Sequence, residues 1–190
     1  ANVVLTKLLR LAQIAGGHVT DENRKTHVVG NEKLKVFDET MDDLLDAGKK
    51  VVVFARFIPE IRAIEKKLQE KGIDYGVVTG AVSQDERGEL VERFQNDPEM
   101  KVFVAQIQTA GLGITLTAAD TAIFYSMDFS LANHEQAKAR IHRIGQKNKV
   151  TYIYLLAENT VDEKVFNALK EKKDIADMVV DNWRDFLKED

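Results

Sequence analysis

Two arginines, Arg140 and Arg143, lie three residues apart in a stretch that is rich in basic residues and has no acidic one. The stretch runs from Gln136 to Lys149, and its bases are Lys138, Arg140, Arg143, Lys147 and Lys149. On a helix, no carboxylate would lie three or four residues from either arginine, so neither guanidinium would have a partner there. Two such planar groups about one turn apart suit a polyphosphate. A solvated helix face is the commoner meaning of a charge run and stays open.

A second candidate is the glycine-containing segment from Gln106 to Thr115. Gly111 and Gly113 would let backbone amides approach a phosphate closely, and the hydroxyls of Thr109 and Thr115 can add donors. A Gly-Leu-Gly turn on its own is more often structural. The segment also lacks the third glycine of the Gly-x-Gly-x-x-Gly dinucleotide fingerprint.

Several groups that nucleotide hydrolysis needs are missing from the sequence. Gly48-Lys49-Lys50 lacks both the earlier glycine and the hydroxyl of a phosphate-binding loop, and no Asp-Glu pair is followed by x-His. Absent cysteines exclude thiolate nucleophiles and Cys-ligated metals, and His142 has no second ligand at metal spacing, so we predict no metal site. If nucleotide chemistry occurs, the groups that cradle phosphate and hold Mg²⁺ lie outside this chain.

Length and composition indicate about one globular domain. The 190 residues are 44% hydrophobic and 31% charged, with a net charge of −4, which excludes a protein that coats nucleic acid by bulk charge. No apolar run approaches the length of a membrane span, so we expect no membrane association. The chain opens with Ala1 and has no signal-peptide pattern, so we expect a piece of a longer protein.

Strand-like and helix-like patterns alternate along the chain. Short apolar runs predict buried strands over Val51–Phe54, Tyr75–Thr79, Lys101–Ala105, Thr121–Ser126 and Thr151–Leu156. Helical spacing predicts helices over Val3–Ala15, from Leu34 to Gly48, from Pro59 to Gly72, after an N-cap at Ser83, and over Leu131–Ile144, Val161–Lys172 and Ile175–Leu187. The polar residues 18–30 are predicted to form a loop.

This alternation predicts an α/β fold with a parallel sheet. Ligands of such sheets bind at the carboxyl ends of the strands, here the loops after Phe54, Thr79, Ala105 and Ser126. In the helix that carries the arginines, Ala137, Ile141 and Ile144 have the spacing of a core-facing side.

The run Ala110–Gln146 resembles the last motifs of the Swi/Snf-like branch of superfamily-two helicases. Within it, QAKARIHRIGQ (Gln136–Gln146) resembles the family's motif VI, an eleven-residue pattern of high specificity. Asn31–Phe57 and Val77–Phe94 are similar to the segments around motif IV, and Val161–Val180 is similar to the brace helix after motif VI. The resemblance covers about residues 3–180.

The resemblance implies the second RecA-like lobe of an ATP-driven DNA translocase or helicase, a three-layer parallel sheet with C-terminal brace helices. It implies an N-terminal helix and linker over 1–30, the lobe over 31–158 and the brace over 159–190. In this family ATP and Mg²⁺ are held mainly by an N-terminal RecA-like lobe of the same protein, which is the expected partner together with DNA.

The resemblance also assigns roles by position. Arg140 and Arg143 correspond to arginine fingers, and the nucleotide-binding positions correspond to Gln136, Gly111 and Gly113. The DNA-binding positions correspond to Arg56, Thr79, Gly80, Gln108, Thr109 and Thr115.

The sequence departs from the family pattern at two places. Family members often have a basic residue and two glycines where this chain has Gln108, Ala110 and Gly111. This difference removes a possible phosphate contact. Phe129-Ser130-Leu131 replaces Trp-Asn-Pro at the entry to motif VI. The sequence around Gly111 is more similar to those of bacterial, phage and annealing-helicase members than to those of chromatin remodellers.

Three interpretations follow. The first is the C-terminal half of a DNA-dependent ATPase, inactive and monomeric when isolated, and intracellular: cytoplasmic if bacterial or phage, nuclear if eukaryotic. The second is a non-catalytic nucleic-acid-binding or regulatory module that keeps the lobe fold. The third is an unrelated α/β domain with a chance motif.

Overall fold

The computed structural model describes residues 2–179, and its centre is a sheet of five parallel strands in the order β4-β5-β3-β6-β7. The strands are β3 (Val51–Ala55), β4 (Tyr75–Val78), β5 (Val102–Gln106), β6 (Thr121–Phe124) and β7 (Thr151–Tyr154). All four pairings between neighbouring strands are parallel. The predicted α/β class is therefore confirmed, and each predicted strand is present with small shifts at its ends.

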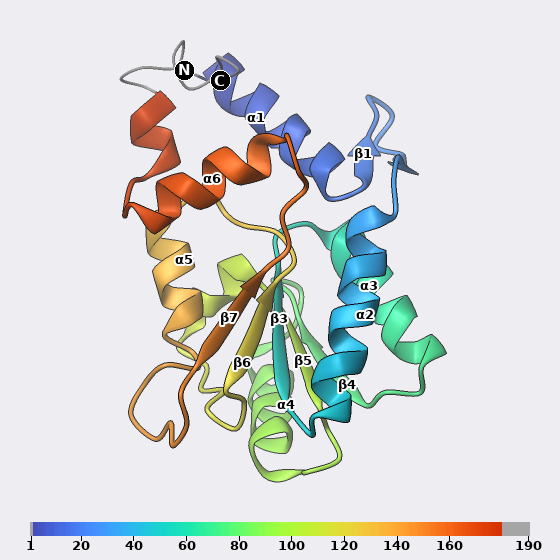
Figure 1. Cartoon of the computed structure of the whole chain (residues 1–190), viewed down its shortest axis with the longest axis vertical. Coiled ribbons are helices and arrows are strands. Elements are labelled where there is room, and N and C mark those ends of the chain that lie inside the picture. Colours follow the sequence, from blue (N-terminus) through green and yellow to red (C-terminus); the bar gives the residue numbers. More distant parts are fainter. Residues whose placement is uncertain (1, 180–190) are drawn as a thin grey trace.

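Helices cover both faces of this sheet, which gives three layers (Figure 1). One face packs against α2 (Glu32–Asp46) and α3 (Ile58–Glu70). The other packs against α4 (Gln84–Asn96), the 3-10 helix η1 (Ile107–Leu112) and α5 (Leu131–Lys138). Side chains alternate along a strand, so Val51 and Val53 of β3 face α2 and α3, whereas Val52 and Phe54 face the other layer.

Two helices near the ends of the chain pack together beyond the carboxyl ends of the strands (Figure 1). These are α1 (Asn2–Ala15) and α6 (Val161–Lys170), whose apolar sides share one cluster that includes Leu8 and Leu169. A buried ion pair, 2.7 Å from Lys33 Nζ to Asp162 Oδ2, ties the start of α2 to the start of α6. The boundaries predicted at residues 31 and 159 stay predictions.

The chain between α1 and α2 is not the loop we predicted. It forms an antiparallel hairpin of β1 (His18–Thr20) and β2 (Thr26–Val28). Asp21 stabilises the turn, because its Oδ1 accepts hydrogen bonds from the backbone N–H groups of Asn23 and Lys25. Such short polar strands carry no apolar alternation, so the sequence pattern did not indicate them.

The predicted start of α4 is confirmed by a reciprocal capping box between Ser83 and Glu86. The helix predicted over Ile175–Leu187 is present in its described part, residues 175–179, and the rest of it lies outside the described residues. None of the helices described in residues 2–179 is long and apolar enough to cross a membrane.

Glu60 is a buried acid in the first turn of α3. Its carboxyl is 1% exposed, and Oε1 accepts hydrogen bonds from the Ser126 hydroxyl at 2.6 Å and from the Phe57 N–H at 3.2 Å. Oε2 has no hydrogen-bond partner in the described structure and lies against Gly16. Burial therefore raises the pKa of Glu60 to about 7, although these hydrogen bonds and the nearby Lys33 oppose the shift.

This raised pKa predicts a pH-dependent stability. The folded state keeps its proton where the unfolded chain has lost it, so the free energy of unfolding falls as pH rises from about 4.5 to 7, by roughly 3 kcal/mol from this residue. In Glu60→Gln, we expect that fall to be absent. Urea unfolding at pH 5 and pH 8 measures it, with the exposed Glu39→Gln as control. An equal pH dependence in wild type and Glu60→Gln would contradict the prediction.

Candidate functional site

The two arginines of the basic stretch converge on one backbone carbonyl. Arg140 Nη1 lies 3.4 Å from Ile114 O, and Arg143 Nη1 lies at the same distance from that oxygen. The structure therefore brings the motif VI arginines next to the glycine-containing segment. These two candidate sites are one place in the molecule.

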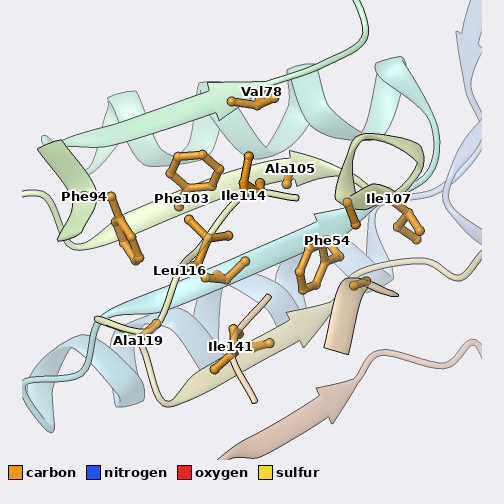
Figure 2. Close-up of a cluster of buried hydrophobic side chains, with 14 of the residues drawn as sticks. Phe54, Val78, Phe94, Phe103, Ala105, Ile107, Ile114, Leu116, Ala119 and Ile141 are labelled. Carbon is orange, nitrogen blue, oxygen red and sulfur yellow. The ribbon is translucent and has the colours of Figure 1, made fainter. Parts of the chain in front are cut away.

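The carbonyl that they share is held in place by the core. The side chains of Ile114 and Leu116 are buried over the sheet beside Phe103 and Phe54 (Figure 2). The Leu116 N–H also donates a 2.9 Å hydrogen bond to Arg140 O, which is a second link between the glycine-containing segment and the arginines. Gly113, just before it, has φ +77, a conformation that side chains with a Cβ rarely adopt.

The helix that we predicted over Leu131–Ile144 is too long. The helix α5 ends at Lys138, and both arginines follow it in a series of turns. The N–H groups of Arg140 and Ile141 bond three residues back, which tightens the chain, and Arg140 O accepts from Leu116 rather than from a later helical turn. This tertiary hydrogen bond fixes the turns just beyond the end of the helix.

Gln146 fixes the end of these turns. Its Nε2 lies 2.8 Å from Ala119 O, 3.1 Å from Ile141 O and 3.3 Å from Thr117 O. Gly145 has φ +100 here, so the chain reverses at a position that favours glycine. Ile141 is buried as predicted, but Ile144 is fully exposed, which corrects the expectation that it faces the core.

No carboxylate of the described residues neutralises the two arginines. Neither Arg140 nor Arg143 forms an ion pair with a carboxylate among residues 2–179. Partial burial and the neighbouring charge of Arg143 both lower the pKa of Arg140, which stays a cation. Two adjacent cations without a counter-ion favour a ligand with more than one negative charge.

Gln136 and Gly111 meet at the same place. A Cβ on Gly111 would lie 2.8 Å from Gln136 Oε1, so the absence of a side chain lets the amide approach the loop closely. Arg140 Nε donates a 2.9 Å hydrogen bond to Gln136 O, which orients the guanidinium. The predicted nucleotide residues therefore form one cluster with the arginines.

A second group lies at the carboxyl ends of β3, β4 and β5. Gln106, at the end of β5, accepts a 3.1 Å hydrogen bond from the Gly80 N–H and places its Nε2 3.4 Å from Arg56 O. Gln106 thereby joins two of the predicted DNA-binding positions. Sequence reasoning included this residue only as the start of the glycine-containing segment and gave it no role, although its place directly after an apolar strand was an available signal.

The predicted DNA-binding residues differ in exposure. Gly80 and Gln108 are exposed, and Thr115 is half-buried. Thr79 and Thr109 are buried, and the Thr109 hydroxyl donates to Gln106 O at 2.6 Å, so it acts within the loop rather than at its surface.

Arg56 is half-buried rather than displayed on a loop. Its guanidinium carbon lies 4.2 Å from the ring centroid of Phe129 and 5.2 Å from that of Phe57. Burial lowers its pKa, and Nη1 is buried without a hydrogen-bond partner in the described structure. Arg56 lines a cavity of about 260 Å³ together with Gln13, His18, Glu60 and Gln106.

Metal ligands do not gather in the described part of the chain. No group of three or more His, Asp or Glu side chains in residues 2–179 is placed to hold a metal ion. The hydrogen-bond donors at the arginine site are guanidinium and amide N–H groups, which suit phosphate oxygens.

Comparisons with known proteins bear on this arrangement. The family model described as "Helicase conserved C-terminal domain" matches residues 32–145, which include the whole arginine site except Gln146. The chain belongs to this helicase family. The predicted resemblance to the Swi/Snf-like branch of superfamily two is confirmed by the relatives that follow.

Curated relatives include the chromatin-remodelling ATPase INO80 of Candida albicans, 34% identical over 79% of this chain and 11% of the relative. The INO80 of Mycosarcoma maydis is 34% identical over 80% of this chain and 8% of the relative. Helicase swr1 of Schizosaccharomyces pombe is 35% identical over 78% of this chain and 12% of the relative. The chain thus spans about a tenth of the length of these relatives.

A solved structure shows the same fold. The crystal structure of the C-terminal part of the Fun30 ATPase domain matches with a TM-score of 0.68 and 24% identity, over 71% of this chain and 44% of that one. The RecA-like three-layer fold is therefore confirmed. These relatives are eukaryotic, so the predicted bacterial, phage or annealing-helicase subgroup gains no support from them.

Proposed function

We propose that this helicase C-terminal domain is the second lobe of an ATP-dependent DNA translocase or helicase, and that Arg140 and Arg143 complete its ATPase site. The observation that carries the proposal is the convergence of both guanidinium groups on Ile114 O without a carboxylate partner in residues 2–179. Named relatives are ATPases and helicases, which supports the same reaction class.

In this proposal the two guanidinium groups stabilise the negative charge that develops as the γ-phosphoryl group leaves. Contacts with Gln136 O and Ile114 O already orient the guanidinium groups before ATP binds, so little reorganisation is needed when it does. An arginine finger contributes about 10³–10⁵ in rate in related hydrolases. Gln136, Gly111 and Gly113 would line the nucleotide beside them.

ATP and Mg²⁺ would be held mainly by the N-terminal lobe, which lies outside this chain. Bound Mg²⁺ supplies charge neutralisation on the phosphates. The residues of this chain orient the guanidinium groups and exclude water from one side of the nucleotide. We therefore expect the isolated chain to hydrolyse ATP negligibly, and we expect it to be monomeric. We expect the full-length protein to lie in the compartment that holds its DNA.

The DNA would contact the edge formed by the carboxyl ends of β3, β4 and β5. Exposed Gly80 and Gln108 would meet the phosphate backbone, with Gln106 fixing the Gly80 N–H and the Arg56 carbonyl. Backbone N–H groups and amides are common phosphate donors. The buried Thr79 and Thr109 would shape these loops, and Thr115 would link them to the arginine site.

In the full-length protein, Arg143→Ala is expected to reduce DNA-stimulated ATP turnover by about 10³-fold, because the transition-state charge loses a donor. Steady-state phosphate release measures the turnover. The matched control is Lys66→Ala, which removes an exposed cation on α3. Thermal unfolding of Arg143→Ala should match wild type, since the side chain is exposed. Wild-type turnover in Arg143→Ala would refute the finger assignment.

Gly80→Glu tests the DNA edge by adding a negative charge there. The site has room, because the nearest atom to an added Cβ is Gln106 Oε1 at 3.9 Å. We expect DNA affinity to fall about tenfold at low salt while DNA-independent ATPase is unchanged. Fluorescence anisotropy with labelled duplex measures the affinity.

Gly88→Glu on α4 adds the same charge at an exposed glycine with open space around it, so it is the matched control. Equal DNA affinity of the Gly80 and Gly88 variants would place the DNA elsewhere on the lobe.

A further inference from the structure

The cavity of about 260 Å³ beside Arg56 lies where α1 and the β1–β2 hairpin meet the carboxyl ends of β3 and β5. Phe57 and Pro59 give it an apolar part with flat rings. Its volume is slightly below the range of pockets that bind drug-sized ligands, so it suits a small molecule or a single chemical group. Its polar lining consists of Gln13, His18, Thr20, Arg56, Glu60 and Gln106.

Buried polar atoms without a hydrogen-bond partner gather at this cavity. The described residues contain five such side-chain atoms, and three of them belong to residues that line it: His18 Nδ1, Arg56 Nη1 and Glu60 Oε2. Buried polar groups are normally paired, because an unpaired group loses its bonds to water and gains none in return. Three of them at one cavity indicate a site that a polar ligand completes.

Hydrogen bonds fix Arg56 and Glu60 relative to each other. The backbone N–H of Arg56 donates to Ser126 Oγ at 2.8 Å, and the Ser126 hydroxyl donates to Glu60 Oε1 at 2.6 Å. The Arg56 guanidinium carbon lies 4.2 Å from the centre of the Phe129 ring, which limits its movement. A cationic donor and a carboxyl group are therefore held in place before a ligand binds, which lowers the cost of ordering them.

The chemistry of the lining favours a neutral ligand that has both donors and acceptors. An anion would pair with Arg56 but would be repelled by an ionised Glu60, and a cation would be repelled by Arg56. Burial lowers the pKa of His18, so its ring is neutral and offers one donor and one acceptor. A nucleobase has adjacent donors and acceptors on one edge and flat faces that stack on aromatic rings.

We propose that this cavity binds one unpaired nucleobase, with Arg56 and Glu60 hydrogen-bonded to its edge and Phe57 against its ring. A base that has left the stack of bound DNA is the source that the position favours, because Arg56 and Gln106 also belong to the proposed DNA edge. The inference rests on that DNA contact and adds recognition of a base, which contacts to the phosphate backbone do not provide.

Two matched DNA substrates test this proposal on the full-length protein. One is a duplex with a single unpaired base, taken as each of the four bases in turn, and the other has an abasic site at the same position. We expect at least one base to bind about tenfold more tightly than the abasic duplex, because stacking and hydrogen bonds are added to the same backbone contacts. Fluorescence anisotropy at one salt concentration measures both affinities.

Variants assign the preference to the cavity. Arg56→Met keeps an apolar side chain against the rings but removes the donor, so the base preference should disappear. Arg62→Met, which removes a 64% exposed cation on α3, is the matched control and should keep it. Gln13→Trp narrows the cavity from α1 and should also abolish the preference, so the result does not depend on one variant. A full preference in both variants, with wild-type melting temperatures, would overturn the assignment.

Free deoxynucleosides have the same base chemistry and form a separate arm, followed by saturation-transfer NMR. Binding that Arg56→Met abolishes, without a base preference in DNA, would assign the cavity to a free nucleoside. Neither binding nor preference in wild type would refute the base site. The abasic duplex keeps this failure distinct from failure of the DNA edge, because a loss of its affinity in Gly80→Glu supports that edge in either case.

Discussion

Two like charges share one backbone oxygen in this protein, and the rest of the site is arranged around that constraint. Guanidinium groups so close to one another repel, and no described carboxylate neutralises them. Water screens this repulsion while the site is open. A bound polyphosphate would neutralise both guanidinium groups and so remove their repulsion. The close approach of the two charges therefore favours the binding of such a ligand.

The Ile114 carbonyl is positioned by the hydrophobic core. Ile114 and Leu116 are part of the core between the sheet and α5, so the oxygen between them is positioned by hydrophobic packing (Figure 2). The hydrogen bond from the Leu116 N–H to Arg140 O and the contacts of Gln146 then fix the arginine turns relative to this core. The proposed chemistry thus depends on ordinary packing of an α/β domain.

Much of this arrangement could be predicted from the sequence, since short apolar runs and helical spacing are local signals. The strands and the capping box at Ser83 both carry such signals. The end of α5 does not, because the turns that replace the helix are held by contacts such as the hydrogen bond from Leu116, more than twenty residues earlier. For the same reason the exposure of Ile144 was missed: helical spacing was extrapolated past the point where the helix ends.

Arg56 shows another limit of the sequence. The resemblance placed it among the DNA-binding positions, whereas the structure packs it against the aromatic rings of Phe57 and Phe129. Phe129 is distant in sequence, so this environment exists only in the folded chain. Gln106 was likewise passed over because an amide at a strand end is unremarkable until Gly80 and Arg56 are seen to meet it.

The most direct test is a structure of the full-length protein with duplex DNA, ADP and aluminium fluoride, in which the distances from the Arg140 and Arg143 guanidinium nitrogens to the fluoride group are measured. We expect a nitrogen of each arginine at about 3 Å, the range of a charge-assisted hydrogen bond. Guanidinium groups paired with carboxylates of the N-terminal lobe, away from the nucleotide, would contradict the proposed role.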